Sequence, residues 1–488
     1  MNAKQPTEPA PNGTERKAAV NDFIEIAEGK AKIIVPKANR TKRGPGKIDA
    51  PVFYNPAMEQ NRGVSVLVFQ SLTSSRGRHI DALDGLAASG IRGIRFCKEV
   101  SGDFSVTIND WSQDAFELIK RNVERNRAEG ASRAGGTAGS AGCAAARNSD
   151  LNALLCERKF DYIDIDPFGT PVDFIDSAVR AVRHKGILGI TATDTAALCG
   201  AGSKACIRRY GAKPLHCEFM HETGLRILAG YVVRTAAKYD RAALPLLCYA
   251  EGHYMRCYFE IKDGAQKADA LLKKIGFAHY CRKCGRRRVS NEVGIRESGF
   301  GNREPRIENR EIGSQGSEIG SRESRIEKRD SGSGNREPRS ENRDLGIGIR
   351  SSELGKHLDF AGAGLKCTCK GKAESAGPLW TGALSDGAFL DKLDAPKEIA
   401  EKKDVAKLLS IWRRESGAPP LYYTTGEIAS LFHIEPPAID DAAAALKSNG
   451  FFACRTHFDP TGFKTDAPFE ALAGMAHILR QKPKSNQS

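Results

Sequence analysis

The chain has 488 residues, which is enough for two or three domains with sizeable cores. Its formal net charge of +14 favours a polyanionic partner, nucleic acid more than membrane, although a merely basic soluble protein would carry a similar excess. Because the N-terminus lacks the apolar core of a signal peptide and no run of about 18 apolar residues occurs, a secreted or membrane-spanning protein is not expected.

Three segments have the composition of tails or loops. Residues 1–20 are polar and proline-bearing and are expected to be a disordered tail, and the small-residue run at 131–147 is expected to be a loop insertion. Residues 289–350 repeat the motif GNREPR and balance acidic against basic side chains, so we expect a disordered insertion that cannot bury enough apolar surface to fold. Two packed blocks remain, 21–265 and 277–488.

The first block alternates strand and helix patterns. A short apolar strand, a turn of small residues and a helix from Ile91 come first, and a strand at 104–109 leads into a helix with Ser112 as its N-cap. Two further strand-length runs, FDYIDID and GILGITATD, precede a hairpin at 244–261. Repeated β–α units predict an α/β fold with helices on both faces of a parallel sheet, which the closing hairpin makes mixed.

Acidic residues occur where three predicted strands end, namely Asp84, Asp110 and Asp166, and a fourth, Asp150, follows the small-residue insertion. Ligands of such a sheet bind beyond the carboxyl ends of its strands. The chain has neither GxGxxG nor GxxxxGK[ST], and an acid about 20 residues after a glycine turn, Asp110 after Gly90, suits a ribose diol. A nucleoside without phosphate, such as S-adenosylmethionine, fits best, although any one of these acids alone is better explained as a cap of the next helix.

The run DPFG, residues 166–169, ends a strand with a carboxylate, a proline and an aromatic ring. An exocyclic amine of a nucleobase is a poor nucleophile, and two acceptors for its N–H groups would draw the lone pair out of the ring. The Asp166 carboxylate and the Pro167 carbonyl are placed for this, and Phe168 offers a face for a flipped base. The alternative is a strand-ending turn whose phenylalanine belongs to the core. Asp164, in the same strand, has no role that the sequence explains.

The chain resembles a known family, the S-adenosylmethionine-dependent tRNA guanine-26 N2-dimethyltransferases of the archaeal type. The resemblance covers most of the chain outside the two insertions, and its most specific motifs are DIDPFGTP, GILGITATDTAALCG and RTHFDPTGFKTDAP. It implies a class I, Rossmann-like methyltransferase domain followed by a smaller, family-specific α+β C-terminal domain. It also implies the reaction, in which the N2 amine of guanine 26 is methylated once and then a second time.

The resemblance also implies site residues. The expected catalytic carboxylate is Asp166, with Pro167 and Phe168 in the roles described above. The expected cofactor-binding residues are Arg62, Asp84, Arg92, Asp110, Asp150 and Leu151. Two positions depart from the family: Gly63 follows Arg62 where an aspartate is usual, and residues 148–154 read NSDLNAL, which leaves Leu151 a backbone contact at best.

The 13 cysteines are expected to be thiols or metal ligands in a cytoplasmic protein, and not a disulfide framework. Cys281 and Cys284 form a C-x₂-C pair, and Cys367 and Cys369 supply a second pair beyond the insertion. Family members carry a four-cysteine zinc site in this region, so a zinc ribbon is expected, with four free thiols as the alternative. Apolar or small-residue surroundings suggest packing roles for Cys97, Cys199, Cys206 and Cys257.

The C-terminal run at 424–458 has the order of a winged-helix-like unit: helix, turn, helix and strand. With the basic runs KGK and IWRRES nearby, it is expected to contact the tRNA backbone, although it could be only a docking module. The expected partner is therefore tRNA, with no membrane and no obligate protein partner. Two other functions stay open: another amino-methyltransferase, acting on adenine N6 or a glutamine amide, or a non-catalytic RNA-binding protein.

Overall fold

The computed structural model describes residues 23–37, 51–131, 143–291, 367, 369–393 and 403–481. The predicted tail at 1–20 lies outside these residues, as do most of the predicted insertions at 131–147 and 289–350. No helix among the described residues is long and apolar enough to cross a membrane.

A seven-stranded mixed sheet forms the centre of the first block, in the strand order β5-β4-β3-β6-β7-β9-β8. The strands β5, β4, β3, β6 and β7 pair in parallel, while β9 is antiparallel to both β7 and β8. This arrangement confirms the predicted α/β fold and the closing hairpin. The strands are β3 (Ile80–Asp84), β4 (Phe104–Asp110), β5 (Ala144–Asn148), β6 (Phe160–Ile165), β7 (Val182–Ala192), β8 (Arg241–Glu251) and β9 (Tyr254–Asp263).

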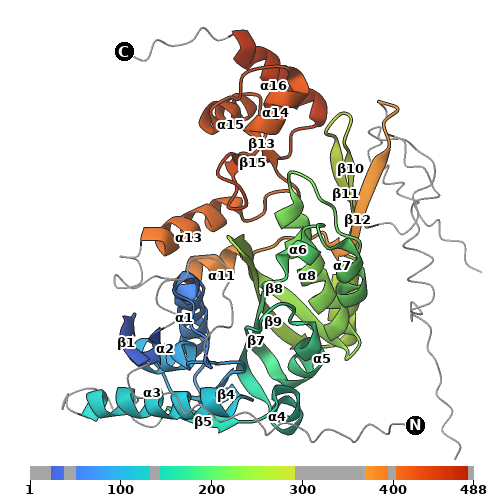
Figure 1. Cartoon of the computed structure of the whole chain (residues 1–488). Helices are drawn as coiled ribbons and strands as arrows, with labels where there is room; N and C mark the ends of the chain where they lie inside the picture. Colours follow the sequence, from blue (N-terminus) through green and yellow to red (C-terminus); the bar gives the residue numbers. More distant parts are fainter. Residues whose placement is uncertain are drawn as a thin grey trace, which may run out of the picture.

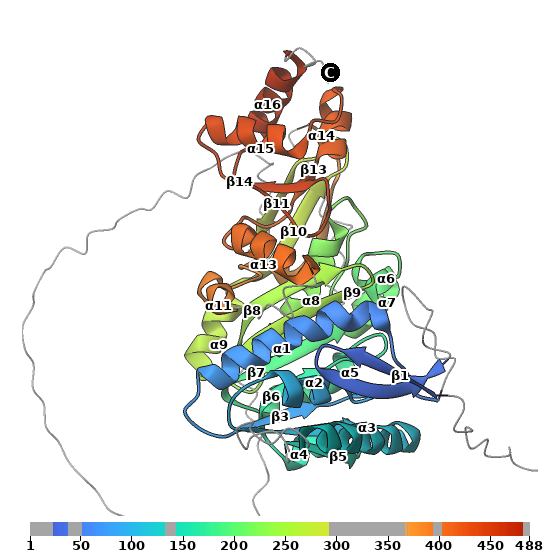
Figure 2. The same ribbon diagram turned by 90° about the vertical axis from the view of Figure 1, so that its left-hand side faces the viewer.

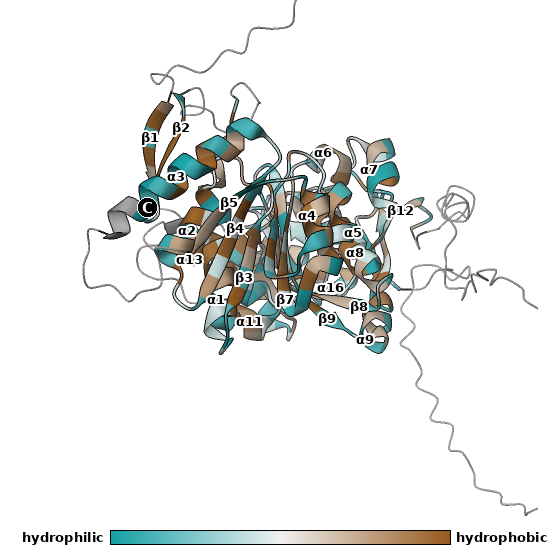
Figure 3. Ribbon diagram, turned by 90° about the horizontal axis from the view of Figure 1, so that it is seen from below, coloured by the Kyte–Doolittle hydropathy of each residue, from teal (hydrophilic) through white to brown (hydrophobic). Residues whose placement is uncertain are grey.

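Helices cover both faces of this sheet, each over its own apolar cluster. Figure 2 shows α1 lying along one face, and Figure 3 shows the apolar strands enclosed by helices with polar outer surfaces. One face carries α1 (Glu59–Ser74), α2 (Ile91–Glu99) and α3 (Gln113–Ala131). The other carries α4 (Leu151–Glu157), α5 (Val172–Ala181), α6 (Thr195–Leu198), α7 (Ser203–Tyr210) and α8 (Met220–Ala237). As predicted, α2 begins at Ile91 and Ser112 immediately precedes α3.

An N-terminal hairpin, β1 (Phe23–Glu28) and β2 (Ala31–Pro36), packs on α3. The Asn122 side chain both donates to and accepts from the Ile34 backbone, at 3.1 and 2.8 Å, and Asn126 binds the Lys32 backbone in the same way. Two asparagines one turn apart on α3 therefore bind the backbone N–H and C=O groups along the edge of β2. A short helix, η3 (Pro56–Met58), leads from this region into α1.

The C-terminal block contains a three-stranded antiparallel sheet and a winged-helix-like unit, which Figure 1 shows at the end of the molecule far from α3 and α4. After α9 (Ala265–Leu272), the sheet consists of β10 (Ile275–Cys281), β11 (Arg287–Ser290) and β12 (Ala373–Trp380). Next come α11 (Gly387–Lys392) and α13 (Lys403–Glu415). The winged-helix-like unit comprises β13 (Tyr423–Thr424), α14 (Thr425–Phe432), α15 (Ile439–Ser448), β14 (Ala453–Arg455), β15 (Gly462–Thr465) and α16 (Phe469–Gln481).

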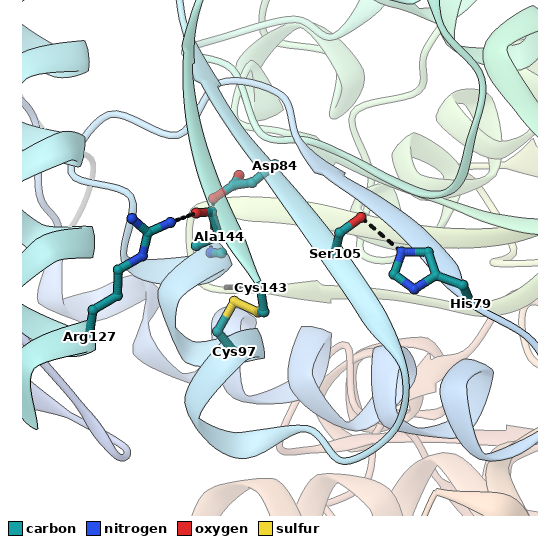
Figure 4. The surroundings of a disulfide bond; sticks show 8 residues. His79, Asp84, Cys97, Ser105, Arg127, Cys143 and Ala144 are labelled. Carbon is teal, nitrogen blue, oxygen red and sulfur yellow. Dashed lines mark hydrogen bonds between the residues drawn. A yellow bond between two sulfur atoms is a disulfide. The ribbon is translucent and has the colours of Figure 1, made fainter. Parts of the chain in front are cut away.

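Three expectations from the sequence are wrong in detail. Residues 144–147 of the expected loop belong to β5, because their backbone pairs with β4 although three alanines in a row show no strand pattern. Residues 289 and 290 belong to β11 and not to the insertion. Cys97 is not a packing thiol, since it forms a disulfide with Cys143 (Figure 4). The pairing of β5 with β4 brings Cys143 next to the last turn of α2, a proximity that a sequence separation of 46 residues does not reveal.

A buried cluster of charges joins the winged-helix-like unit to the first block. Glu222 on α8 accepts hydrogen bonds from Arg226, from the Leu421 backbone N–H at 3.0 Å and from the Lys464 ammonium at 2.8 Å. Lys464, on β15, also lies 3.3 Å from Glu415 at the end of α13. Separating the blocks would leave buried charges of this cluster without partners, which is strongly destabilising. The cluster therefore holds the two blocks in one relative orientation.

Replacing the central cation should destabilise the whole protein. We expect Lys464→Met to lower the free energy of unfolding by about 3–5 kcal/mol, because Glu222 and Glu415 would then repel each other in a buried site. Burial raises the pKa of Glu222, but Lys464 and Arg226 outweigh that effect and lower it below 4.5. This stabilisation is present above pH 4.5 and is lost as the pH falls through the lowered pKa, so the difference between wild type and variant should shrink on acidification. Urea unfolding between pH 3 and pH 8 measures both effects.

The matched control is Lys447→Met on α15, where the lysine is exposed. An equal loss of stability in the two variants would contradict a special role of the buried cluster.

Candidate active site

A cavity of about 730 Å³ opens at the carboxyl edge of the sheet, where β3, β4, β5 and β6 end. All nine residues predicted for catalysis or cofactor binding line it: Arg62, Asp84, Arg92, Asp110, Asp150, Leu151, Asp166, Pro167 and Phe168. The acids come together because parallel strands end at the same edge. The acids differ in the hydrogen bonds that they make within the protein, and these determine how many carboxylate oxygens remain available to a ligand.

The turn after β3 brings the backbone close to the cavity. Asp84, at the end of β3, is buried, and its carboxylate accepts the Gly93 N–H at 3.0 Å. Gly90 has φ +78°, and a Cβ at Gly93 would lie 2.6 Å from Ile108 on β4, so α2 can begin against the sheet only without these side chains. Burial raises the pKa of Asp84 to about 7, an effect that the nearby Arg92 opposes.

Asp110 and Asp150 have different surroundings. Asp110 ends β4 and accepts hydrogen bonds from the Ala88 and Ser112 N–H groups, at 2.8 and 2.9 Å, which hold its carboxylate at the rim of the cavity. Asp150 caps α4 by accepting the Ala153 N–H at 2.9 Å. The helix-cap explanation therefore accounts for Asp150 in this structure, whereas Asp110 binds the turn after β3.

Leu151 packs under the glycine turn, because a Cβ at Gly85 would lie 3.0 Å from its side chain. Its side chain is buried in the apolar cluster beneath the sheet. This placement agrees with the expectation that Leu151 can reach a ligand only through its backbone.

Arg62 is bound by an acid that the sequence did not single out. Its guanidinium donates to Glu28 of β1, with Nε–Oε1 at 2.7 Å and Nη2–Oε2 at 2.5 Å, and to the Asn55 carbonyl at 3.1 Å. Burial would raise the pKa of Glu28, but Arg62 and Arg95 lower it to about 2. Arg62 thus anchors the N-terminal hairpin at the cavity wall, and most of its donors are already in use.

The DPFG turn is fixed to the neighbouring strand. The Gly169 N–H donates to the Thr193 hydroxyl at 2.7 Å, the Thr193 N–H donates to the Gly169 carbonyl at 2.9 Å, and Gly169 has φ +80°. Within the described part of the chain, no hydrogen bond reaches the Pro167 carbonyl. The Phe168 side chain is 53% exposed, so it does not belong to the core. Its ring packs edge-to-face against Phe53, with 4.6 Å between the ring centroids.

Arg92 and Asp164 form an ion chain behind Asp166. Arg92 pairs with the Asp166 carboxylate through Nη2 and lies 3.3 Å from Asp164 through Nε. Asp164 has no exposed surface and binds both terminal nitrogens of Arg256, at 2.5 and 3.1 Å, and the Tyr162 hydroxyl at 2.8 Å. Arg92, expected to bind a cofactor, is therefore held mainly by acids of the protein, and Asp164 has the partner that the sequence did not reveal.

Two further residues at the cavity escaped sequence reasoning. Trp111 follows Asp110, lines the cavity and is 75% exposed, which an isolated tryptophan after a strand does not predict. His253 lies in the turn between β8 and β9, and the pairing of Ala192 with Met255 brings this turn to the carboxyl edge. The hairpin was predicted, but only its register with β7 reveals that the histidine lines the cavity.

The four predicted cysteines converge at one end of the small sheet. The sulfur atoms of Cys281, Cys284, Cys367 and Cys369 all lie within 4.8 Å of one another, with Cys284 and Cys367 at 3.4 Å and Cys281 and Cys369 at 3.5 Å. Four thiolates around one zinc ion at about 2.3 Å would lie about 3.8 Å apart, so this cluster could hold zinc. Gly371 is required there, since a Cβ would lie 2.8 Å from the Cys281 sulfur.

Comparison with known proteins gives one consistent result. Residues 29–477 match the family described as N2,N2-dimethylguanosine tRNA methyltransferase. The chain is similar to the tRNA (guanine(26)-N(2))-dimethyltransferases of Pyrococcus furiosus and Methanobrevibacter smithii, with 36% and 33% identity over 92% and 93% of this chain and 97% of each relative. It also resembles the structure of Trm1 from Pyrococcus horikoshii with S-adenosyl-L-methionine, with a TM-score of 0.66 and 33% identity over 93% of this chain and 99% of that chain.

A zinc ion at the four cysteines should be measurable directly. We expect the purified protein to contain one zinc ion per chain by elemental analysis, and removal by a strong chelator to lower the melting temperature. Cys284→Ser should lose the metal, because three thiolates leave one tetrahedral position without a protein ligand. Cys156→Ser, at an exposed cysteine outside the cluster, is the control. Metal-free wild-type protein with unchanged stability would count against a structural site.

Proposed function

The chain belongs to the N2,N2-dimethylguanosine tRNA methyltransferase family, and on this premise we propose that it methylates the N2 amine of guanine 26 in tRNA twice, using S-adenosylmethionine. The observation that carries the proposal is the exposed DPFG turn, whose carboxylate, carbonyl and ring face one cavity. Neither a core turn nor a purely binding protein requires that combination.

The cavity suits a nucleoside cofactor without phosphate. Asp110 would bind the ribose hydroxyl groups, and Asp84 would lie towards the ammonium group of the methionine part. None of the described residues that line the cavity is a lysine, which fits a ligand lacking phosphate. When bound, S-adenosylmethionine supplies an electrophilic methyl group on a sulfonium centre, and the chain's own residues have to present the nucleophile to it.

The DPFG residues would present that nucleophile. Phe168 stacks on the flipped guanine, which contributes about 1–3 kcal/mol. The free oxygen of Asp166 and the Pro167 carbonyl each accept one N–H of the amine, which draws its lone pair out of the ring. As the methyl group passed to the nitrogen and its bond to sulfur broke, the amine would lose one proton towards Asp166, which would restore a neutral amine. The same steps on the monomethylated amine give dimethylguanosine.

We assign tRNA backbone contacts to the C-terminal block and a cytoplasmic location to the protein. The assignment to this block is supported by Arg414 on α13, which is exposed. Arg413, in the same basic run, binds the Leu390 and Leu393 carbonyls and so fixes the helix in place. The four cysteines would hold a structural zinc ion that keeps the end of the small sheet closed.

Removing the proposed catalytic carboxylate should separate binding from chemistry. We expect Asp166→Ala to bind S-adenosylmethionine almost as well as wild type and to lose transfer by at least about 10²-fold, since no acceptor remains for one N–H. Alanine is preferred to asparagine because an amide oxygen could still accept that hydrogen bond. Labelled cofactor with unmodified tRNA, followed by nucleoside analysis, measures transfer, and calorimetry measures binding.

Asp173→Ala is the control, because this exposed acid on α5 lines the same cavity outside the DPFG turn. Near-native dimethylation by Asp166→Ala would overturn the mechanism.

Asp84 should link cofactor binding to proton release. Because burial raises the pKa of Asp84 to about 7, much of this carboxyl group is protonated at pH 6.5 in the free protein. A cofactor ammonium group, with a pKa of about 8, would favour the carboxylate form, so binding should release a proton and tighten as the pH rises through 7. Calorimetry in buffers of different ionisation enthalpy measures the release. Binding heats of wild type that are identical in all buffers, or unchanged proton release in Asp84→Asn, would refute this link.

A further inference from the structure

We propose that the buried chain Arg256–Asp164–Arg92–Asp166 positions the Asp166 carboxylate, and that the second methyl transfer depends on this chain more than the first. The inference rests on the proposed function and adds Asp164 and Arg256 as positioning residues. Of the four side chains, only Arg92 and Asp166 line the cavity. Arg256 and Asp164 would therefore act through their neighbours.

Arg92 restrains one oxygen of Asp166 and is itself fixed from three sides. It pairs with Oδ2 of Asp166, donates to Asn61 at 2.9 Å and to Ser65 at 2.5 Å, and lies 3.3 Å from Asp164. The Asp166 side chain keeps 19% of its surface exposed, whereas Asp164 keeps none. Arg92 thus holds the rear of the Asp166 carboxylate and leaves Oδ1 for a substrate.

Arg256 fixes the chain from across the sheet. It comes from β9 and reaches Asp164 on β6 over the intervening strand β7, where it also donates to Thr191 at 2.8 Å. The crossing is possible because Gly189 stands opposite Asp164 on β7, and a Cβ at that glycine would lie 2.6 Å from the Arg256 guanidinium. The guanidinium also lies over the Tyr258 ring at 4.4 Å.

This arrangement is costly for stability alone. Burying two guanidinium groups and the Asp164 carboxylate gains little over an apolar core of similar volume, and Nε of Arg256 is buried without a hydrogen bond. The adjacent residues of β6 and β7, Ile163, Ile165, Leu188 and Ile190, pack in the apolar cluster on the opposite face of the sheet, so the charges are confined to one face. Within this row of ion pairs, Asp166 is the residue whose position is made rigid.

The two methyl transfers make different demands on Asp166. In the first, the amine has two N–H groups and two acceptors, so the Pro167 carbonyl can help to hold it. In the second, one N–H remains, and a charged acceptor binds it more strongly than a carbonyl. Asp166 alone then aligns the amine. A misplacement of about 1 Å can cost about 100-fold in rate, so a loosened carboxylate should harm the second transfer more.

Single-turnover kinetics can test this difference. Arg256→Lys keeps the charge but loses the planar fork, and Asp164→Asn keeps the volume but loses the charge. With enzyme in excess over tRNA, we expect the rate constant on unmethylated tRNA to fall about tenfold. The rate constant on tRNA that already carries N2-monomethylguanosine should fall at least about tenfold further. Cofactor affinity, measured by calorimetry, should change less than about twofold.

Arg226→Lys is the matched control, because Arg226 is another buried arginine paired with a carboxylate, Glu222, but lies outside the cavity. A general loss of stability should slow both transfers by the same factor in this variant. If Arg256→Lys and Asp164→Asn do not fold, Thr191→Val is the alternative, because it removes one hydrogen bond to Arg256. It should also slow the second methyl transfer more than the first, by a smaller factor.

The possible outcomes separate this inference from the proposed function. Equal slowing of both transfers in the positioning variants, with a wild type that dimethylates, would overturn the positioning role alone. A wild type that forms no N2-methylguanosine would overturn the proposed function and this inference with it.

Discussion

The Asp164 carboxylate lies at the centre of the sheet with no exposed surface, and two guanidinium groups bind it. Arg92 comes from α2 and Arg256 from β9, so this one acid ties a helix and an antiparallel strand to β6. A buried acid of this kind is stable only if both cations stay in place. The positions of the Arg92 and Arg256 guanidinium groups, and through Arg92 the position of the Asp166 carboxylate, therefore depend on it.

Much of the site follows from topology. Because parallel strands end at one edge, the acids after β3, β4 and β6 could be placed together from the sequence, and so could the four cysteines on two short spacings. The partners of the arginines could not. Glu28 ends a short N-terminal strand whose approach to α1 only the tertiary fold reveals, and Arg256 occupies a strand position that reads as one polar residue in an apolar run. Such pairs depend on which strands become neighbours, which local patterns do not encode.

The disulfide between Cys97 and Cys143 shows the same limit. Composition and the lack of a secretion signal argue for free thiols, and for the other cysteines in the described residues the structure shows no disulfide. The exception is Cys143, which immediately precedes the edge strand β5 and lies next to the last turn of α2 (Figure 4). Small alanines in β5 hide the strand from any pattern of burial, so both the strand and the bond were missed together.

The junction between the blocks has consequences for the substrate. Apolar residues of both blocks share one cluster, in which Tyr422 and Phe458 of the C-terminal block lie with Phe219 and Leu225 of the first. The buried Glu222–Lys464 pair fixes the orientation of β15 against α8. A tRNA bound to the C-terminal block would therefore meet the cavity at a set distance, which selects a nucleotide by its place in the tRNA fold. In the proposed mechanism, the DPFG turn would then have only to accept the exocyclic amine of the base at that place.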